Sequence, residues 1–265
     1  IGSYPAARLS VFDPAKPVRF GLDEVANPRE LGRVDDVAFR PRAMVAGPAG
    51  KVWVGSIPDY GMWGGTLAWY DTAAKRFGSH RHVIKDCCPY STTWLPELDR
   101  LLVGLSIEGG TGTQPRAKKA GFCLWDPYKD AAEWTGDLGL NVNTVFDVFA
   151  VGEGMAYAAV LENGEEKRPT VHYLDVRRRK ILSSCVLEDP PHGWVPEGTQ
   201  TMFRHGAYLY GATYRGVYRA RIGTTEVEPY WQGQGVEGPP GGGALVGDNW
   251  YFPRYHRLRV LELPH

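Results

Sequence analysis

Residues 43–83 read AMVAGPAGKVWVGSIPDYGMWGGTLAWYDTAAKRFGSHRHV, and this stretch decides the fold. Four runs of strand length, rich in β-branched and aromatic residues, alternate here with turn residues such as the GPAG that follows the first run. The predicted strands are 43–46, 51–55, 66–70 and 75–83. Four short strands in a row, joined by turns, indicate one antiparallel four-stranded unit.

The same unit recurs along the chain with a period of about 50 residues, which is typical of propeller blades. Its marker is an apolar run that closes on aspartate, at Asp13, Asp71, Asp126 and Asp175, with spacings of 58, 55 and 49 positions. We therefore predict an all-β fold, a β-propeller with four-stranded blades.

The blade boundaries follow from this period. We predict one propeller domain over residues 1–265, with a partial first blade at 1–35, full blades at about 36–85, 86–138, 139–188 and 189–233, and a last partial blade at 234–265. Two strands of the first blade, four full blades and three final strands make 21 strands, which close no ring. We predict a seven-bladed propeller whose N-terminal part is missing, with a five-bladed ring as the alternative.

Composition excludes several classes of protein. The 33 glycines and 20 prolines in 265 residues exclude a coiled coil or helical bundle, and 43% apolar residues with nine tryptophans exclude a disordered chain. A net charge of zero gives no footprint for nucleic acid, and no apolar run is long enough for a membrane span. We expect a monomer that takes a glycan or small-molecule substrate. Of the four cysteines, neighbours Cys87 and Cys88 are interpreted as small residues in a turn, with a vicinal disulfide as the alternative.

Part of the chain resembles a known group of propellers. The segments that carry the resemblance are 40–48, 52–61 and 64–67, together with 2–5 and 9–14. They look like units of large microbial propeller proteins, and the chain is similar to propeller polysaccharide lyases, among them the L-rhamnose-α-1,4-D-glucuronate lyases. The match is specific over residues 1–75 and carries over no catalytic residue. The resemblance implies a carbohydrate-active protein and, by analogy, an extracellular or periplasmic location.

Site predictions therefore rest on topology, because the loops from second to third strand and from fourth strand to the next blade commonly converge at a channel mouth. The long second-to-third-strand loops are 57–65, 107–119 and 162–168. The glycine-rich part of the second of these loops, 108–116, lacks the strand-to-helix context of a phosphate-binding loop. It is interpreted as a plain flexible loop.

Arginines in the predicted loops point to a carboxylate ligand, since guanidinium groups bind carboxylates bidentately. The candidates are Arg42, which with Arg40 flanks a proline before an inner strand, and Arg215 and Arg254. The alternative is that these arginines pair with acids of the blades. Trp63 and Trp194 are predicted to stack on sugar rings.

Histidines and tyrosines supply the candidate acid and base groups. His192 lies in the proline-rich loop 189–197 and is the first candidate base, and His256 is the second. Candidate proton donors are Tyr60, Tyr214 and Tyr255. By contrast, His80 and His82 alternate along the strand 75–83, which favours a packing or surface role, and His172 is interpreted as structural.

No cofactor is predicted. The sequence has no zinc spacing and no nucleophile elbow, and Asp59 with Glu108 is the one weak candidate for calcium ligands. Our leading hypothesis is a lyase that cleaves a uronate-containing glycan by β-elimination. The alternative is a non-catalytic propeller module that binds a glycan or a protein, so the sequence leaves open whether the chain is an enzyme.

Overall fold

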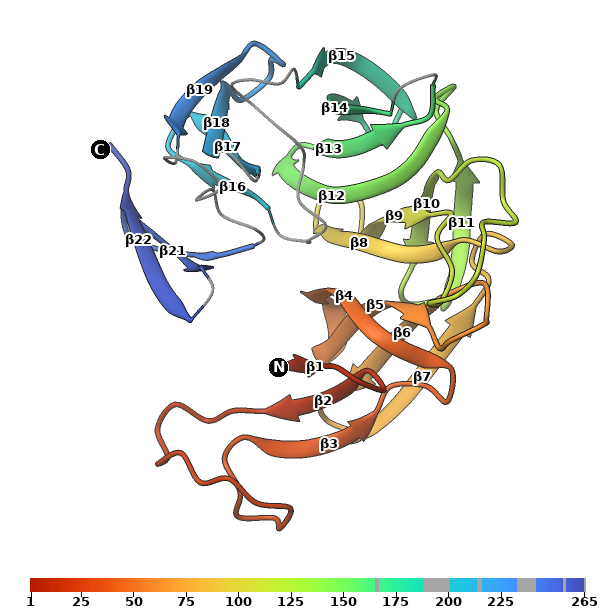
Figure 1. Ribbon diagram of the computed structural model, residues 1–265, viewed down its shortest axis with the longest axis vertical. Coiled ribbons are helices and arrows are strands. Elements are labelled where there is room, and N and C mark those ends of the chain that lie inside the picture. Colours follow the sequence, from red (N-terminus) through yellow and green to blue (C-terminus); the bar gives the residue numbers. More distant parts are fainter. Residues whose placement is uncertain (165–166, 188–200, 214–215, 233–241, 255, 265) are drawn as a thin grey trace. The chain divides into compact units, whose positions relative to one another are not determined.

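The computed structural model describes residues 1–164, 167–187, 201–213, 216–232, 242–254 and 256–264. It divides into two compact units, Ile1–Pro89 with Ile107–Ala117, and Tyr90–Ser106 with Lys118–His265. Each unit consists of antiparallel sheets in which consecutive strands are neighbours (Figure 1). Such meanders are the blades of a β-propeller, which confirms the predicted fold class. The number of blades in a closed ring stays a prediction.

The first unit holds two sheets. The first sheet contains β1 (Gly2–Ser3), β2 (Arg8–Val11) and β3 (Arg29–Arg33). The second contains β4 (Ala38–Ala46), β5 (Lys51–Pro58), β6 (Thr66–Asp71) and β7 (Arg76–Arg81). The prediction of two strands in the first blade was wrong by one, because Gly2–Ser3 pairs with Arg8 and Leu9 as a short strand of its own.

The second unit begins with two meanders that share one bridge, between Ser106 and Thr144. Their strands are β8 (Cys88–Leu95), β9 (Arg100–Ser106), β10 (Phe122–Asp126) and β11 (Ala131–Gly136), then β12 (Val142–Gly152), β13 (Met155–Glu162), β14 (Arg168–Asp175) and β15 (Lys180–Val186). Two more sheets follow, with β16 (Met202–His205), β17 (Tyr208–Thr213), β18 (Gly216–Arg221) and β19 (Val227–Gln232), and with β20 (Ala244–Val246), β21 (Asn249–Arg254) and β22 (Arg257–Glu262).

The repeated aspartates make the turn after the third strand of a meander. Asp71 ends β6, and its Oδ1 accepts hydrogen bonds from the backbone N–H groups of Ala73 and Ala74 at 3.0 and 2.8 Å. The bond from Ala74 is the main cause that lowers the pKa of Asp71. Asp126 and Asp175 end β10 and β14 and accept backbone N–H groups in the same way. The repeat seen in the sequence is therefore a repeated turn.

Each of these turns closes with a residue in the left-handed region. Lys75, Asp130 and Arg179 have φ angles of 52°, 55° and 57° and directly precede the outer strands β7, β11 and β15. Since non-glycine residues seldom adopt this conformation, its recurrence at one place in three meanders indicates that the turn geometry is part of the fold.

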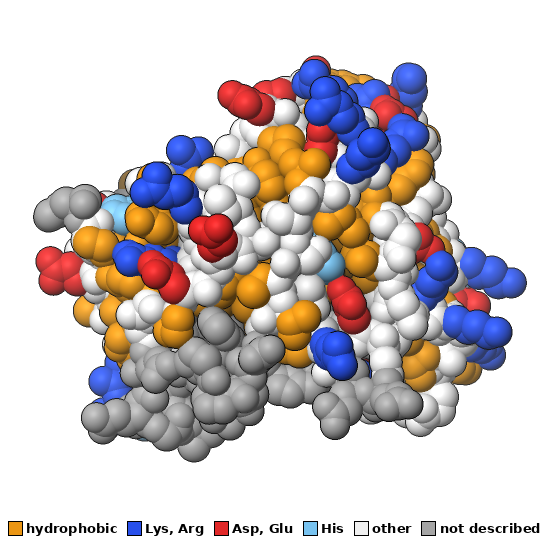
Figure 2. All heavy atoms as spheres, turned by 90° about the horizontal axis from the view of Figure 1, so that it is seen from above, with side chains coloured by type: hydrophobic (Ala, Val, Ile, Leu, Met, Phe, Trp, Pro, Cys, Tyr) orange, Lys and Arg blue, Asp and Glu red, His pale blue; other side chains and the backbone are white. Residues whose placement is uncertain are grey.

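Aromatic and aliphatic side chains fill the interior of each unit. In the first unit Leu9, Val54 and Tyr70 belong to one buried cluster, with Leu31 and Met44 packed against it. In the second unit Phe203 stacks on Trp250 with ring centroids 4.8 Å apart. Outside, Lys and Arg side chains lie among Asp and Glu on the face drawn in Figure 2, as the net charge of zero leads one to expect.

Three of the four cysteines are buried thiols, and Cys185 is half-buried. Cys87 and Cys88 are free and fully buried, so they form no vicinal disulfide. The predicted turn was wrong, because Cys88 begins strand β8 and Cys87 directly precedes it. Burial raises the pKa of Cys87 to about 11 and that of Cys88 to about 12. Within the described ranges, no helix has the length and apolar character needed to cross a bilayer.

One buried carboxylate joins two sheets of the second unit. Asp147 on β12 is 4% exposed. Its Oδ2 accepts the backbone N–H of Thr201 at 2.7 Å, the hydroxyl of Thr201 at 3.1 Å and the N–H of Met202 at 2.8 Å. Because Thr201 directly precedes β16, this carboxylate holds the start of one sheet against the first strand of another.

We predict that Asp147→Asn lowers the free energy of unfolding by about 2 to 4 kcal/mol, because an amide nitrogen cannot accept the bonds that Oδ2 accepts. Urea denaturation followed by circular dichroism measures the loss. Glu226→Ala is the matched control, since the exposed Glu226 side chain makes no described bond. Equal stability of Asp147→Asn and the control would contradict the role given to this carboxylate.

Candidate functional site

Two loops of the first unit dock on each other through their backbones. In the loop after β5, the N–H of Gly61 donates to the carbonyl of Thr111 at 3.1 Å. In the opposite direction, the N–H of Gly110 donates to the carbonyl of Met62 at 2.9 Å. The Nη2 of Arg40 on β4 donates to Thr111 Oγ1 at 2.8 Å. The glycine-rich loop thus makes hydrogen bonds along the β5–β6 loop, and its predicted flexibility stays a prediction.

Glycine makes this docking possible. A Cβ on Gly110 would overlap the carbonyl oxygen of Asp59, and a Cβ on Gly109 would lie 2.9 Å from the carbonyl oxygen of Met62. By contrast, nothing lies within 4 Å of a Cβ built on Gly112. Gly109 and Gly110 therefore serve close approach between two backbones.

Beside the docked loops lies a cavity of about 460 Å³ that carries an excess of positive charge. It is lined by Gly61, Met62, Trp63, Arg81, His82, Lys85, Asp86 and Arg116. Three of these side chains are cationic and one is acidic. We call it the cationic pocket. It is built from the β5–β6 loop, the segment after β7 and the end of the glycine-rich loop.

Trp63 is the fixed aromatic wall of the cationic pocket. Its Nε1 donates to the carbonyl of Gln114 at 2.8 Å, which orients the indole. The guanidinium carbon of Arg116 lies 3.3 Å from the ring centroid, within cation–π range. The Nη2 of Arg81 donates to the carbonyl of Trp63 at 3.4 Å. The structure thus places two arginines around one tryptophan.

His82 stands at the end of strand β7 and not on it. The predicted strand 75–83 ends at Arg81, because His82 has a φ of 54°, which turns the chain into the pocket wall. The ring Nδ1 accepts the backbone N–H of Asp86 at 3.2 Å. In the neutral ring the proton therefore sits on Nε2, so the ring can donate a hydrogen bond there.

Tyr60 belongs to an aromatic cluster next to the cationic pocket. Its ring meets Phe39 edge to face at 5.2 Å, and Phe39 meets Tyr4 in the same way at 5.3 Å. A hydrogen bond with Tyr4, followed by one with Arg40, lowers the pKa of the Tyr60 hydroxyl. Tyr60 is 52% exposed, so this hydroxyl is open to solvent.

The other predicted site residues do not join this cluster. Arg42 on β4 is half-buried and close enough to Cys88 for its charge to act on that thiol, and it does not line the cationic pocket. His256 is exposed in the turn between β21 and β22 of the second unit. His192, Trp194, Tyr214, Arg215 and Tyr255 lie outside the described residues, as does the side chain of Arg254.

Sequence reasoning missed four charged lining residues and His82. Arg81 and His82 were hidden because the predicted outer strand ran to 83, two residues too far. One signal could have found some of them. In a propeller, the connections from a fourth strand to the next blade commonly converge at the same channel mouth as the loops from second to third strand. Applied to 82–87, that rule selects Lys85 and Asp86. Arg116 lies in a loop that sequence analysis did single out.

Among the described residues, the predicted calcium ligands Asp59 and Glu108 belong to no cluster of metal-ligating side chains. Asp59 Oδ1 accepts the N–H of Tyr60 at 2.7 Å, and its Oδ2 lies 3.9 Å from Arg33 Nη2. Glu108 presents its carbonyl to the Cys88 thiol at 2.8 Å. In the part of the chain that the structure describes, no three His, Cys, Asp or Glu side chains gather as metal ligands.

Comparison with known proteins supports the fold. No family model and no curated protein matches the chain. The extracellular domain assigned to a one-component system of B. thetaiotaomicron aligns with a TM-score of 0.55 and 12% identity, over 88% of this chain and 28% of that chain. A chain of the mitotic checkpoint complex aligns with a TM-score of 0.48 and 12% identity, over 89% of this chain and 71% of that chain. Acylaminoacyl peptidase of Pyrococcus horikoshii aligns with a TM-score of 0.48 and 8% identity, over 86% of this chain and 38% of that chain. The first of these similarities shows the propeller-like fold and no more, and the chain spans less than a third of that neighbour.

We predict that Gly110→Ala separates the two docked loops, because its Cβ cannot coexist with the carbonyl of Asp59. The expected result is faster amide hydrogen exchange at Gly61 and across 107–117, measured by mass spectrometry. Gly112→Asn is the control, since Gly112 has a φ of 84° in open space and asparagine tolerates the left-handed region. Unchanged exchange in Gly110→Ala would show that the docking does not depend on this glycine.

Proposed function

We propose that this chain is a carbohydrate-binding propeller module whose cationic pocket takes an acidic glycan, one built from uronate sugars. The observation that carries the proposal is the convergence of Arg81, Lys85 and Arg116 around Trp63, with Asp86 as the one acidic lining residue. A propeller module that binds or acts on a ligand is also what the fold comparison supports.

The chemistry of the lining matches a uronate in two respects. Guanidinium and ammonium groups bind carboxylates by charge-assisted hydrogen bonds, and the part of the Trp63 indole that Arg116 does not cover offers an apolar surface for the ring of a sugar. The cavity, about 460 Å³, falls in the usual range of about 300 to 1,000 Å³ for small-molecule sites.

The histidine of the cationic pocket is placed as a hydrogen-bond donor rather than as the base that elimination requires. Removal of the proton next to a uronate carboxylate needs a group that can accept it. His82 uses Nδ1 to accept the N–H of Asp86, so its neutral ring presents the protonated Nε2. It is thus a hydrogen-bond donor to a ligand in the pocket.

We predict that Arg116→Ala weakens binding of a tri-galacturonate about tenfold, because it removes a cation and its stacking on Trp63. Isothermal titration calorimetry at low and high salt measures the change, and binding should weaken as salt rises. The control Arg177→Ala removes an exposed arginine of the second unit and should leave the affinity unchanged. If tri-galacturonate and neutral tri-galactose bind equally, the proposal is rejected.

A second candidate function, β-elimination, is favoured by one observation, the lowered pKa of Tyr60 beside Arg40. In this reaction the Tyr60 phenolate takes the proton at C5 of the uronate. The C5–H electrons form the C4–C5 double bond, the C4–O bond breaks, and the leaving oxygen takes up a proton. Arg40 is placed to neutralise the carboxylate while charge develops on it.

If this reaction occurs, its rate rises with pH as Tyr60 deprotonates and levels off below the pH of about 10 expected for an ordinary tyrosine. Ultraviolet absorbance of the unsaturated uronate product follows the reaction. Tyr60→Phe should abolish it, while the control Tyr128→Phe, another exposed tyrosine, should not. If the protein binds uronate glycans of a panel but none of them gives an absorbance change, elimination is rejected and the binding function is kept.

A further inference from the structure

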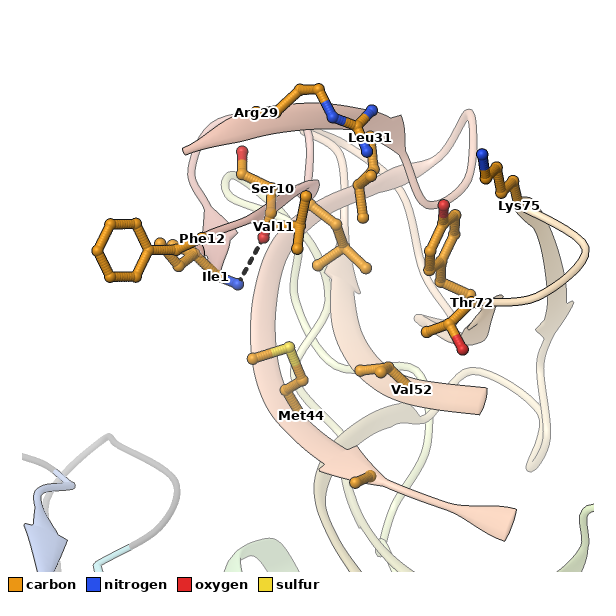
Figure 3. A pocket seen from close by; sticks show the side chains of 13 residues that line it. Ile1, Ser10, Val11, Phe12, Arg29, Leu31, Met44, Val52, Thr72 and Lys75 are labelled. Carbon is orange, nitrogen blue, oxygen red and sulfur yellow. Dashed lines mark hydrogen bonds between the residues drawn. The ribbon is translucent and has the colours of Figure 1, made fainter. Parts of the chain in front are cut away.

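A second cavity of the first unit is apolar and lies away from the cationic pocket. Its volume is about 570 Å³, and it opens between the first sheet and strands β4, β5 and β6. It is lined by Ile1, Leu9, Ser10, Val11, Phe12, Arg29, Leu31, Met44, Ala46, Val52, Tyr70, Thr72 and Lys75. We call it the apolar cavity (Figure 3).

The floor of the apolar cavity is continuous with the hydrophobic core. Leu9 and Tyr70 are buried core residues, and Leu31 and Met44 pack against that core while still lining the cavity. Figure 3 shows Leu31, Met44 and Val52 around the hollow between the strands. An aliphatic group placed there would remove from water both its own surface and part of these side chains.

The charges on the rim of the apolar cavity are all positive. Arg29 stands on β3 and Lys75 in the turn before β7, and Figure 3 shows both at the edge of the hollow. No acidic side chain lines the cavity. Among the described residues neither Arg29 nor Lys75 has an ion pair, whereas Arg8 pairs with Glu30 and Lys16 with Asp13. Two cations are therefore available to a ligand.

The apolar cavity is separate from the cationic pocket. Val52 lines the apolar cavity near the start of β5, while the loop of the cationic pocket begins after Pro58 at the end of the same strand. Six residues of extended strand span about 20 Å. The two cavities share no lining residue.

We propose that the apolar cavity binds a free fatty acid, an amphiphile with one aliphatic chain and one carboxylate. The chain fits the lining of Leu31, Met44 and Val52, and the carboxylate fits the rim cations Arg29 and Lys75. A cationic amphiphile would face two like charges, and a sugar would leave its hydroxyl groups without partners against the apolar lining. The proposal does not depend on the function assigned to the cationic pocket.

Titration calorimetry with dodecanoate, below its micelle concentration, tests the chain and the head group separately. Each buried methylene strengthens binding about fourfold, so dodecanoate should bind far more tightly than octanoate. Dodecanoate should also bind more tightly than dodecylammonium of the same chain length, because of the rim charge. Equal affinity for dodecanoate and dodecylammonium would overturn the assignment of a carboxylate.

Variants locate the site. The double variant Arg29→Ala with Lys75→Ala should weaken dodecanoate binding about tenfold. The control double variant Arg177→Ala with Lys180→Ala removes two exposed cations of the second unit and should not change it. Val52→Phe should fill the cavity and abolish binding. Thermal unfolding of each variant shows that it is folded, so a lost affinity reports on the site.

Two results would overturn the proposal. One is dodecanoate binding that neither Val52→Phe nor the Arg29 and Lys75 double variant weakens. The other is a dimer, seen by sedimentation velocity, that Val52→Phe dissociates and dodecanoate does not, because the apolar cavity would then be covered by a second copy of this chain.

Discussion

Antiparallel pairing of consecutive strands is the constraint on which this structure depends. Every strand that pairs with the one before it must be reached by a reversal of the chain, and the backbone groups within each reversal need partners. Asp71, Asp126 and Asp175 meet that need at the turns after the third strands, where their carboxylates accept backbone N–H groups. Those turns are short and alike. The loops between second and third strands after β5 and β9 are longer, and there the chain has room for a site.

The candidate site is therefore a product of loop docking. The hydrogen bonds from Gly61 to Thr111 and from Gly110 to Met62 hold two loops side by side. Through them Trp63 acquires a partner for its Nε1, and Arg116 acquires a ring to stack on. A net charge of zero for the whole chain coexists with a local excess of cations, because three basic side chains and one acidic side chain converge on one cavity.

Much of the fold could be predicted because it depends on local pattern. The second sheet appears at the predicted places, with β4 and β5 longer than expected because their pairing continues past two bulges. The candidate site was harder to predict from the sequence. Trp63 and Tyr60 were singled out as loop aromatics, but His82 was assigned to a strand, and nothing in its neighbours in sequence signals a φ of 54°. In this left-handed conformation the His82 ring packs closely against Gly64, where a Cβ would collide with it. The conformation is therefore part of a tertiary contact.

The sequence by itself determined the class of fold, the approximate positions of most strands and the turn at each repeated aspartate, since each rests on residues close together in the chain. Only the tertiary structure decided which loop residues form a site. Trp63 and Gln114 are 51 positions apart, and their hydrogen bond requires two loops to meet. The apolar cavity likewise needs side chains from two sheets. Hydrophobic period and turn chemistry are local, whereas the convergence of charge and the shape of a cavity depend on contacts between distant segments.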